Sequence, residues 1–503
     1  MFIRHRCLSG PGLQAIAHWY SALPARPGYP DRATLAPKDA VLTLAPDFIQ
    51  LLGTLLGDRF TQSLADREAH AGTEAHHVPM PPDAVARPVS TEEVSQIVNL
   101  CAFYGTPVVA YGNGSSLEGN ATAAEGGLCL DMTLMNRVLE VRPDDLDCTV
   151  EAGVTREALN DHLRHTGLFF PVDPGANATL GGMTATRASG TTAVRYGTMA
   201  DNVICLTIVL PDGQVIRTAR RARKSSAGYD LTHLFTGSEG TLGIITEVTL
   251  RLHGRPEAVR SARCIFPDPL SASEAASTAI QIGLPLARIE YLDAGCIRAV
   301  NAFSGLSEPP ADTLFLEFHG SEAGVDEQVA LFEEIAAEHG GTGFRWAATE
   351  AERAKLWAAR HSAYTATLRQ RAGARGWATD VCVPISALPG CIDHAKRLLA
   401  DCPVPASIMG HVGDGNFHVV FAIDPESEDE RALVARINDS MVERALACDG
   451  TCTGEHGVGL GKRKYMRREH GAALEVMHRI KTALDPYGVM NPRKIFPDDQ
   501  AAR

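Results

Sequence analysis

The chain of 503 residues lacks any uninterrupted apolar run long enough to cross a membrane. Its longest apolar stretch, LTLAPDFIQLLGTLLG, is broken by Pro46 and Asp47, whereas a spanning helix needs about 20 predominantly apolar residues. We therefore expect no transmembrane span. Residues 1–50 also lack the apolar core and cleavage site of a signal peptide. For this N-terminal extension, disorder, a weak organelle-targeting segment and an extended start stay open.

An excess of positive charge is missing as well. The formal net charge of −13 argues against nucleic acid as a partner, because phosphate binding requires clustered Lys and Arg. The 12 cysteines contain no C-x-x-C pair, so a zinc ribbon, an iron–sulfur cluster and a secreted disulfide framework are not indicated. A reducing compartment is the simpler interpretation. We expect a cytoplasmic location, which leaves peripheral attachment at the inner membrane open, with a mitochondrial location as the alternative.

What is present is the composition of a globular protein with more than one domain. Hydrophobic residues make up 45% and charged residues 21%, and the length favours two or more domains. The segment STEEVSQIVNLCAFYG predicts a helix with Ser90 as N-cap and Glu93 three residues later. Strand-like pairs follow, up to a boundary near residue 256. Beyond it, strands alternate with longer helices, one ending at Gly340 and another covering 426–447. The second domain is therefore expected to be α+β.

The stretch GHVGDGNFHVVF (410–421) places two histidines seven positions apart. Gly413 and Gly415 make a helix between them improbable, since each glycine costs about 1 kcal/mol relative to alanine. A glycine-rich loop that leads into the strand FHVVF fits better, and such a loop lets His411 and His418 converge on one point. Converging imidazoles suggest a metal ion. The alternative is that each histidine caps a backbone group in a packed turn.

Three glycine-dense segments occur within the first half of the chain. They are YGNGSSLEG (111–119), PVDPGANATLGGMTATRASG (171–190) and FTGSEGTLGIIT (235–246). Small residues let backbone N–H groups approach an anionic phosphate closely. None of the segments is a G-x-G-x-x-G after a strand or a P-loop, so we expect a large phosphate-bearing cofactor in a fold that is not a Rossmann fold.

Seven motifs in fixed order then resemble one family: GNGSSLEG, DPGANATLGGM, YGTMADNV, AGYDLTHLFTGSEGTLGIIT, GHVGDGNFH, GEHGVGLGK and NPRKIF. The set is similar to the FAD-linked oxidases of vanillyl-alcohol-oxidase type, in the D-lactate dehydrogenase and glycolate oxidase branch. The resemblance covers about residues 80–497. It implies an α+β fold, with a PCMH-type FAD-binding domain of two subdomains at 80–255. An α+β cap domain with an antiparallel sheet and a metal site at 256–480 follows, and residues 481–497 return to the FAD domain.

The resemblance also implies the contacts of the cofactor. Since neither His nor Cys occupies the family's attachment positions, we expect non-covalent FAD. At the C-terminal contact the family usually has glycine before the lysine, whereas this chain has Arg493. The implied FAD contacts are Gly112, Asn113, Gly114, Ser115, Ser116, Pro174, Thr179, Gly181, Gly182, Tyr196, Gly197, Asn202, Glu239, Gly240, Ile245 and Asn491.

For the chemistry, the resemblance implies Zn²⁺ or Mn²⁺ on His411, His418 and Glu455. Two histidines and one carboxylate leave positions open for a substrate, as catalytic metals require. His456 resembles the catalytic base, which takes the hydroxyl proton of a 2-hydroxy acid near neutral pH while the C2 hydrogen leaves as hydride. Arg360 matches the carboxylate clamp, because a guanidinium pairs bidentately with a carboxylate.

Two side chains bear on the substrate. Tyr364, one helical turn after Arg360, would add a hydrogen bond to it, with an ordinary packed aromatic as the alternative. Val420 stands where relatives that act on 2-hydroxyglutarate carry a polar side chain, so a small apolar substrate tail is favoured.

The expected function is an FAD- and metal-dependent dehydrogenase that converts a D-2-hydroxy acid, D-lactate first, into the 2-oxo acid. A glycolate oxidase FAD subunit and a D-2-hydroxyglutarate-type dehydrogenase are the alternatives. Since no nicotinamide fingerprint occurs, electrons are expected to pass to cytochrome c, a quinone or an electron-transfer flavoprotein.

Two alternative functions belong to other functional classes: a non-redox alkyl-glycerone-phosphate synthase-like transferase and a non-catalytic flavoprotein subunit. His411, His418 and Glu455 count against both. A homodimer stays open.

Overall fold

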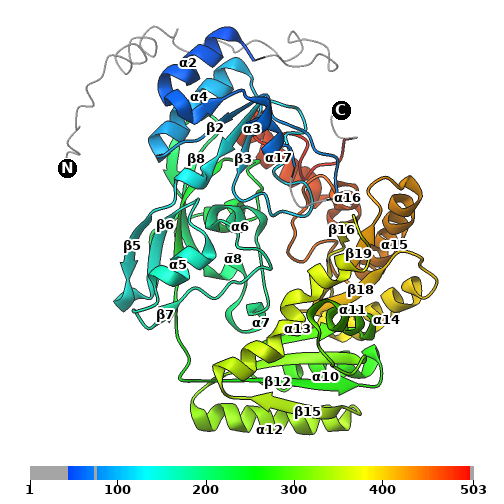
Figure 1. Ribbon diagram of the computed structural model, residues 1–503. Coiled ribbons are helices and arrows are strands. Elements are labelled where there is room, and N and C mark those ends of the chain that lie inside the picture. The colour runs from blue at the N-terminus through cyan, green and yellow to red at the C-terminus, as the bar shows by residue number, and fades with distance from the viewer. Residues whose placement is uncertain (1–43, 73–75, 499–503) are drawn as a thin grey trace.

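The computed structural model describes residues 44–72 and 76–498, so the expectations for residues up to 43 lie outside the described part. The chain forms two halves (Figure 1). The first half is drawn in blue to green and the second in green to orange. The red C-terminal segment lies between them.

The first half contains two sheets. A four-stranded sheet has the order β1 (Phe60–Thr61), β2 (Ala84–Ala86), β4 (Leu128–Asp131), β3 (Val108–Tyr111), with β2 and β3 parallel to β4. An antiparallel five-stranded sheet has the order β5 (Val138–Arg142), β6 (Asp147–Glu151), β10 (Ile244–Arg251), β8 (Val203–Val209), β9 (Val215–Arg217). The helices of this half are α2 (Pro46–Leu56), α3 (Leu64–Ala69), α4 (Thr91–Tyr104), α5 (Arg156–His162), α6 (Leu180–Thr186), α7 (Ala193–Tyr196), α8 (Met199–Asn202) and α9 (Leu231–Phe235). A short pair, β7 (Leu168–Phe169) with β11 (His253–Gly254), precedes the second half.

Helix α4 follows the sequence prediction at both ends. The Ser90 hydroxyl accepts a hydrogen bond from the Glu93 backbone N–H, and Gly105 ends the helix in the left-handed conformation. The apolar positions Val94, Ile97, Val98 and Cys101 are all buried against the four-stranded sheet. The helix expected from the spacing is confirmed, because N-cap, apolar stripe and C-terminal glycine agree.

The second half is built on one eight-stranded sheet. Its order is β15 (Thr342–Ala347), β12 (Ala258–Phe266), β14 (Asp312–Gly320), β13 (Leu286–Leu292), β18 (Ala406–His411), β19 (Asn416–Ile423), β16 (Arg375–Ala378), with β17 (Val381–Cys382) also on β19. All these neighbours run antiparallel. The predictions of a strand after the glycine turn and of an antiparallel sheet are confirmed.

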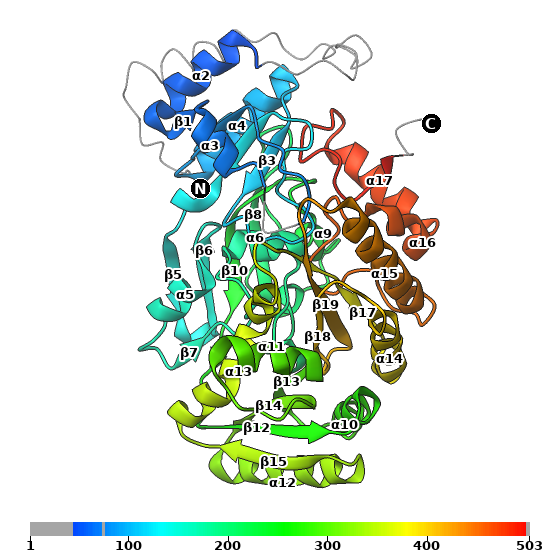
Figure 2. The same ribbon diagram turned by 45° about the vertical axis from the view of Figure 1, so that its right-hand side comes forward.

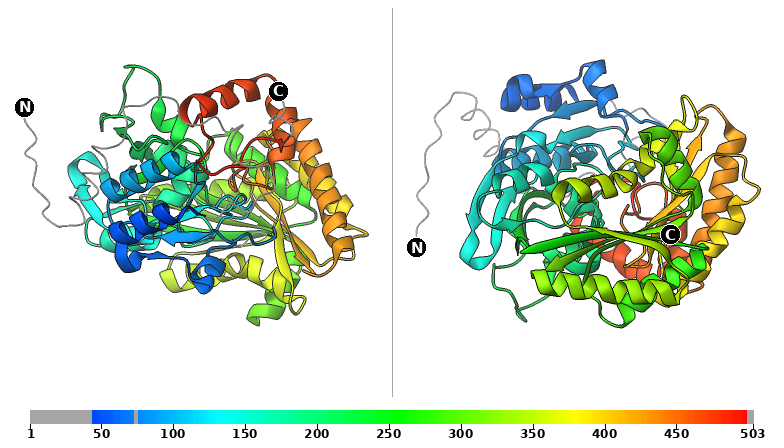
Figure 3. Two further views of the ribbon diagram at one scale, coloured as in Figure 1. Left: turned by 90° about the horizontal axis from the view of Figure 1, so that it is seen from above. Right: turned by 60° about the horizontal axis from the view of Figure 1, so that its bottom comes forward.

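Helices cover both faces of this sheet. The main core is formed with α10 (Pro269–Gln281), α12 (Glu322–Glu338), α14 (Leu388–Leu399) and α15 (Glu428–Leu446), which pack on one face. A smaller core is formed on the other face with α11 (Ala294–Ser304) and α13 (Glu350–Arg369). Figures 1 and 3 show α12 and α13 on opposite sides of the strands. The helices predicted to end at Gly340 and to cover 426–447 are confirmed as α12 and α15.

The alternation of side chains along the strands places several polar residues on the face of the eight-stranded sheet that α13 covers. Side chains alternate between the two faces of a strand, and Leu314, Leu316 and Phe318 of β14 point into the main core. Glu317 and His319 therefore point to the opposite face. By the same period, so do Glu290 of β13 and His418 of β19. This face combines a small apolar core with buried polar side chains.

The C-terminal segment crosses back to the first half. After α16 (Met466–His470) and α17 (Ala473–Leu484), Met490 pairs in parallel with Val108 of β3. The Lys494 ammonium, 2% exposed, donates a hydrogen bond to the Thr122 carbonyl at 2.7 Å. Ile480 and Leu484 of α17 pack against the core of the first half that contains Phe235 of α9, and Figure 2 shows α17 on the side of α9. In the described ranges 44–72 and 76–498, no helix is both long and apolar enough to span a bilayer.

Candidate active site

The structure brings the three predicted metal ligands together. His411 ends β18, His418 lies in β19, and Glu455 lies in the loop that follows α15. The Glu455 Oε1 atom lies 3.2 Å from His411 Nε2 and 3.3 Å from His418 Nε2. All three side chains are largely buried, and the two imidazole planes stand at 81° to each other.

The outer hydrogen bonds of the two histidines fix which ring nitrogen faces the cluster. His411 Nδ1 lies 2.7 Å from Glu290 Oε1, and His418 Nδ1 lies 2.9 Å from the Thr379 carbonyl. Both partners are acceptors, so each Nδ1 carries the proton, and in the neutral ring Nε2 presents a lone pair to Glu455.

This donor set fits a divalent cation. Two nitrogen lone pairs and a carboxylate oxygen repel one another unless a positive charge lies between them. Burial lowers the pKa of His411, but the Glu290 and Glu455 carboxylates outweigh it and hold the pKa well above 6.5. A bound cation would replace that proton. Within the described part of the chain, the buried Glu455 Oε2 atom has no hydrogen-bond partner, which also fits a role of this carboxylate in binding a cation.

A second group, Asp380 with His418 and His456, has similar spacing but does not fit a cation. The Asp380 side chain is fully buried, and its oxygens already accept four hydrogen bonds of 2.7–3.0 Å. Burial opposes its charge, yet the neighbouring His456 and His418 lower the pKa of Asp380 overall. Asp380 is therefore an anionic acceptor whose two oxygens are already engaged by protein donors.

His456 lies directly beside the cluster. Its ring stacks on the His418 ring at 5.1 Å between centroids and 9° between planes. Its Nδ1 atom is buried without a hydrogen-bond partner among the described residues, and Glu118 Oε1 lies 3.9 Å away. Burial lowers the pKa of His456, but Asp380 and Glu118 raise it above its ordinary value. The arrangement places an imidazole whose Nδ1 atom makes no hydrogen bond within the described residues where it can exchange a proton with a molecule bound at the cluster.

Arg360 is linked to the metal-ligand cluster by Glu290, which accepts hydrogen bonds from both Arg360 and His411. Its Nε atom donates to Glu290 Oε2 at 2.7 Å, and Glu290 is fully buried between Arg360 and His411. The guanidinium is thus oriented by a carboxylate that also orients a proposed metal ligand. Tyr364, on the same helix, packs against β16, since a methyl group added at Gly376 would collide with its hydroxyl. This position fits the packed-aromatic alternative.

The first half offers close backbone approaches at the segments expected to hold FAD. A side chain at Gly112 would collide with Thr179, which caps α6, and one at Gly181 would lie 2.6 Å from the Ala152 methyl group. The hydroxyls of Ser116 and Ser238 are buried without partners among the described residues. Unsatisfied hydroxyls beside glycine-rich backbone fit a cofactor with phosphate and polar ring atoms.

The remaining predicted FAD residues lie on the same half, and several of their side chains already have protein partners. Gly114, Gly197 and Gly240 have positive φ angles, and Gly112, Ser115, Ser116 and Pro174 lie in connecting loops. Gly181 and Gly182 lie in the first turn of α6. Ile245 is buried in the core beneath α6, and Gly182 donates to Thr179. Side-chain hydrogen bonds within the protein are made by Asn113, Tyr196, Asn202, Glu239 and Asn491.

Sequence reasoning missed four buried charged residues around the site: Glu118, Glu290, Asp380 and Lys462. Lys462 is 2% exposed and donates to the Asp380 and Cys452 carbonyls. The signal that could have revealed two of them is an acidic residue inside an apolar strand segment, as in LARIEYL and TDVCV. Acids in such positions are rarely buried without a partner.

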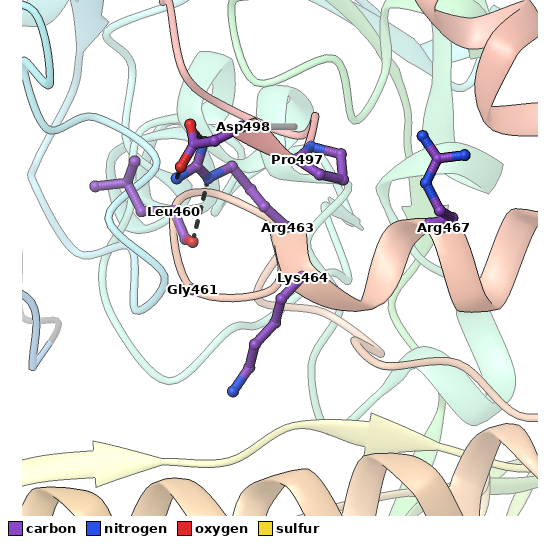
Figure 4. A pocket seen from close by; sticks show the side chains of 7 residues that line it. All are labelled: Leu460, Gly461, Arg463, Lys464, Arg467, Pro497 and Asp498. Carbon is purple, nitrogen blue, oxygen red and sulfur yellow. Dashed lines mark hydrogen bonds and ion pairs between the residues drawn. The ribbon is translucent and has the colours of Figure 1, made fainter. Parts of the chain in front are cut away.

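A separate surface cavity of about 380 Å³ lies outside this cluster (Figure 4). Its lining is basic, and Arg463 forms an ion pair with Asp498 at 2.7 Å. None of the predicted site residues lines it. The lining residues are Leu460, Gly461, Arg463, Lys464, Arg467, Pro497 and Asp498.

Comparison with known proteins finds relatives over both halves of the chain. Residues 82–219 match the family described as FAD binding domain, and residues 255–495 match FAD linked oxidases, C-terminal domain. A probable mitochondrial D-lactate dehydrogenase of Danio rerio is 51% identical, over 86% of this chain and 88% of its own. The mitochondrial D-lactate dehydrogenase [cytochrome] of Arabidopsis thaliana is 44% identical, over 97% and 87%. The glycolate oxidase subunit GlcD of Bacillus subtilis is 32% identical, over 90% and 97%.

Solved structures show the same fold at low identity. The 4-ethylphenol oxidase of Gulosibacter chungangensis aligns with a TM-score of 0.73 at 20% identity, covering 90% of this chain and 98% of its own. An alkyldihydroxyacetonephosphate synthase aligns with a TM-score of 0.70 at 20% identity, covering 96% and 92%. These likenesses concern the fold, and the α+β architecture with a PCMH-type FAD-binding half is confirmed.

Proposed function

Because the chain belongs to the family of FAD-linked oxidases, we propose that it is an FAD- and divalent-metal-dependent dehydrogenase that oxidises D-lactate to its 2-oxo acid. One observation carries the proposal. The Nε2 atoms of His411 and His418 converge on Glu455 Oε1 within 3.3 Å, and the His456 imidazole stacks on the His418 ring. The metal is proposed as Zn²⁺ or Mn²⁺.

Each group has a defined chemical task. FAD would supply the hydride acceptor, and a cation held by His411, His418 and Glu455 would supply Lewis acidity. His456 accepts the hydroxyl proton at an imidazole nitrogen. Arg360 orients the substrate carboxylate with the nitrogens that it does not use on Glu290. Glu290 and the Thr379 carbonyl hold the protons on the Nδ1 atoms of His411 and His418.

The substrate assignment rests on the relatives and on one side chain. Val420 is buried in the small apolar core that also contains Met409 and Trp357, so it offers no polar partner to a second carboxylate. This supports a short apolar tail over a 2-hydroxyglutarate-type acid. The relatives named D-lactate dehydrogenase [cytochrome] favour a cytochrome as electron acceptor over a quinone or an electron-transfer flavoprotein.

The names of the same relatives favour a mitochondrial location, and the cytoplasmic location expected first has no support from them.

The FAD is proposed to be non-covalent, so acid precipitation should release it into the supernatant. Covalent retention in the pellet would contradict that part of the proposal.

Anaerobic flavin absorbance tests the function directly. D-lactate should bleach the oxidised flavin, and L-lactate at the same concentration should leave it unchanged. Dialysis against a chelator should abolish bleaching while the protein stays yellow, and added Zn²⁺ or Mn²⁺ should restore it. A flavin that no D-2-hydroxy acid reduces would contradict the proposal and would leave the non-redox synthase reaction as the better reading of the fold.

A further inference from the structure

The loop 454–461 carries both Glu455 and His456, and it runs between the two halves of the protein. On the cap side its backbone is held by Asp380, which follows β16. Asp380 Oδ2 accepts the backbone N–H groups of Glu455 and His456, both at 3.0 Å, and the Thr453 hydroxyl at 2.7 Å. The N–H groups of the proposed metal ligand and the proposed base thus share one buried oxygen.

On the FAD side the same loop is held by Glu239. Its carboxylate accepts the backbone N–H groups of Val458 at 2.6 Å and Gly459 at 2.9 Å, and the Asn120 amide at 2.8 Å. Glu239 has a φ of +52°, a conformation that few residues with a side chain adopt. That strain fits a side chain aimed at one target, and the target here is the loop backbone.

The loop lies too close to the first half for larger residues. Gly457 has a φ of +77°, and a Cβ atom there would lie 2.8 Å from the Asn120 amide nitrogen and 2.9 Å from Glu239 Oε1. The next N–H groups, those of Leu460 and Gly461, bond to the Glu118 carbonyl at 2.7 and 3.3 Å. Contacts from both halves therefore fix successive peptide units of one short loop.

We propose that Asp380 and Glu239 are positioning residues that clamp loop 454–461 from opposite sides and so set Glu455 and His456 relative to the FAD-binding half. The assignment rests on the proposed function. It moves the Glu239 carboxylate from the FAD contacts to the loop. Neither carboxylate touches the reacting atoms. Each acts through the backbone, as supporting groups around metal ligands do.

The test uses the full-length holoprotein with Asp380→Asn and Glu239→Gln. Each change keeps the shape of the side chain but turns one acceptor oxygen into a donor that faces other donors. Glu151→Gln is the matched control, since Glu151 of β6 is also buried and accepts the Arg137 backbone N–H at 2.8 Å rather than a group of the loop. The measured quantity is the limiting rate of anaerobic flavin reduction by D-lactate per bound FAD. Metal content and thermal stability are measured in parallel.

Both variants should reduce flavin about 10–100-fold more slowly per bound FAD. The Asp380→Asn variant should also bind the metal more weakly, whereas the Glu239→Gln variant should bind it as the wild type does. Of the two carboxylates, Asp380 is the one that accepts the backbone N–H of Glu455. Glu151→Gln should match the wild-type rate per bound FAD. A lowered stability alone would leave the rate per bound FAD unchanged, so this readout separates positioning from folding.

Wild-type rates per bound FAD in both variants would overturn the clamp. If Asp380→Asn fails to fold, Thr453→Val removes the hydroxyl that bonds to the same oxygen and lies 3.0 Å from the Gly457 carbonyl of the loop, and it should slow the rate by about 2–10-fold. An unchanged rate in Thr453→Val would then count against the Asp380 arm. Absence of flavin reduction in the wild-type protein refutes the proposed function instead, which keeps the two failures distinct.

Discussion

Replacing Glu290 by glutamine should weaken metal binding without removing the flavin. Glu290 is fully buried and accepts from His411 Nδ1 and Arg360 Nε, both at 2.7 Å. Glutamine has one acceptor oxygen for these two donors. If that oxygen faces Arg360, the amide NH₂ faces His411, whose proton must then move to Nε2. The imidazole loses the lone pair that it presents to Glu455.

The magnitude follows from the supporting role. Loss of the group that orients a histidine ligand lowers metal affinity by about 10–100-fold, or about 1.4–2.8 kcal/mol. Loss of a hydrogen bond to a charged group also destabilises the fold by about 1.5–3 kcal/mol. Both effects arise in the second half of the chain, so FAD content should stay at the wild-type level.

Glu317 provides the matched control. It is largely buried on the same face of the sheet and accepts from His319 Nε2 at 2.9 Å, with Arg288 at 3.6 Å. Glu317→Gln should therefore cost similar stability but leave the metal in place. The assay is equilibrium dialysis against buffered Zn²⁺ and Mn²⁺, with metal per bound FAD read by elemental analysis. Equal metal affinities for Glu290→Gln, Glu317→Gln and wild type would refute the reasoning.

Three further outcomes are expected. His456→Ala should keep FAD and metal but slow anaerobic flavin reduction by about 10²–10⁴-fold; a near-normal stopped-flow rate would remove its role as base. Arg360→Lys keeps the charge but loses the planar fork, so steady-state kcat/KM for D-lactate should fall about 10–100-fold, mainly through KM. Burial raises the pKa of Asp293 from 3.8 to about 6, so wild-type stability is lost as pH rises through that interval. Asp293→Asn should remove that loss and gain about 1–2 kcal/mol at pH 7 in denaturant unfolding, since the side chain is still partly exposed.

Local features were readable from the sequence because their causes are local. Helix α4 needed only Ser90, an apolar stripe and Gly105. The glycine turn before His418 needed only the cost of glycine in a helix. The two histidines could be suspected of converging, but Glu455 joined them through family resemblance, because nothing local ties a residue to partners 44 positions away.

The carboxylates that orient the site residues could not be predicted from the sequence, because their partners also lie far away along the chain. Glu290 meets His411 across 121 positions, and Asp380 meets His456 across 76. Their contacts depend on which strands are neighbours in the sheet and on the register between them. A shift of one residue in β13 would turn Glu290 into the opposite core. Composition and periodicity do not fix that register, so a lone acid in an apolar strand predicts burial at most.

Two buried carboxylates on the same face of the sheet, Glu290 and Glu317, have similar partners. The difference between their surroundings indicates what a metal site requires. Glu290 lies between a histidine and an arginine, and so does Glu317. Around Glu317 the histidine's other nitrogen bonds to the Tyr196 hydroxyl at 2.7 Å, which satisfies it. Around Glu290 the histidine's other nitrogen meets Glu455 and a second imidazole. A carboxylate that orients a histidine is therefore not sufficient. The loop that delivers Glu455 turns one of two equivalent supports into a candidate metal centre, which is why the position of that loop should govern activity.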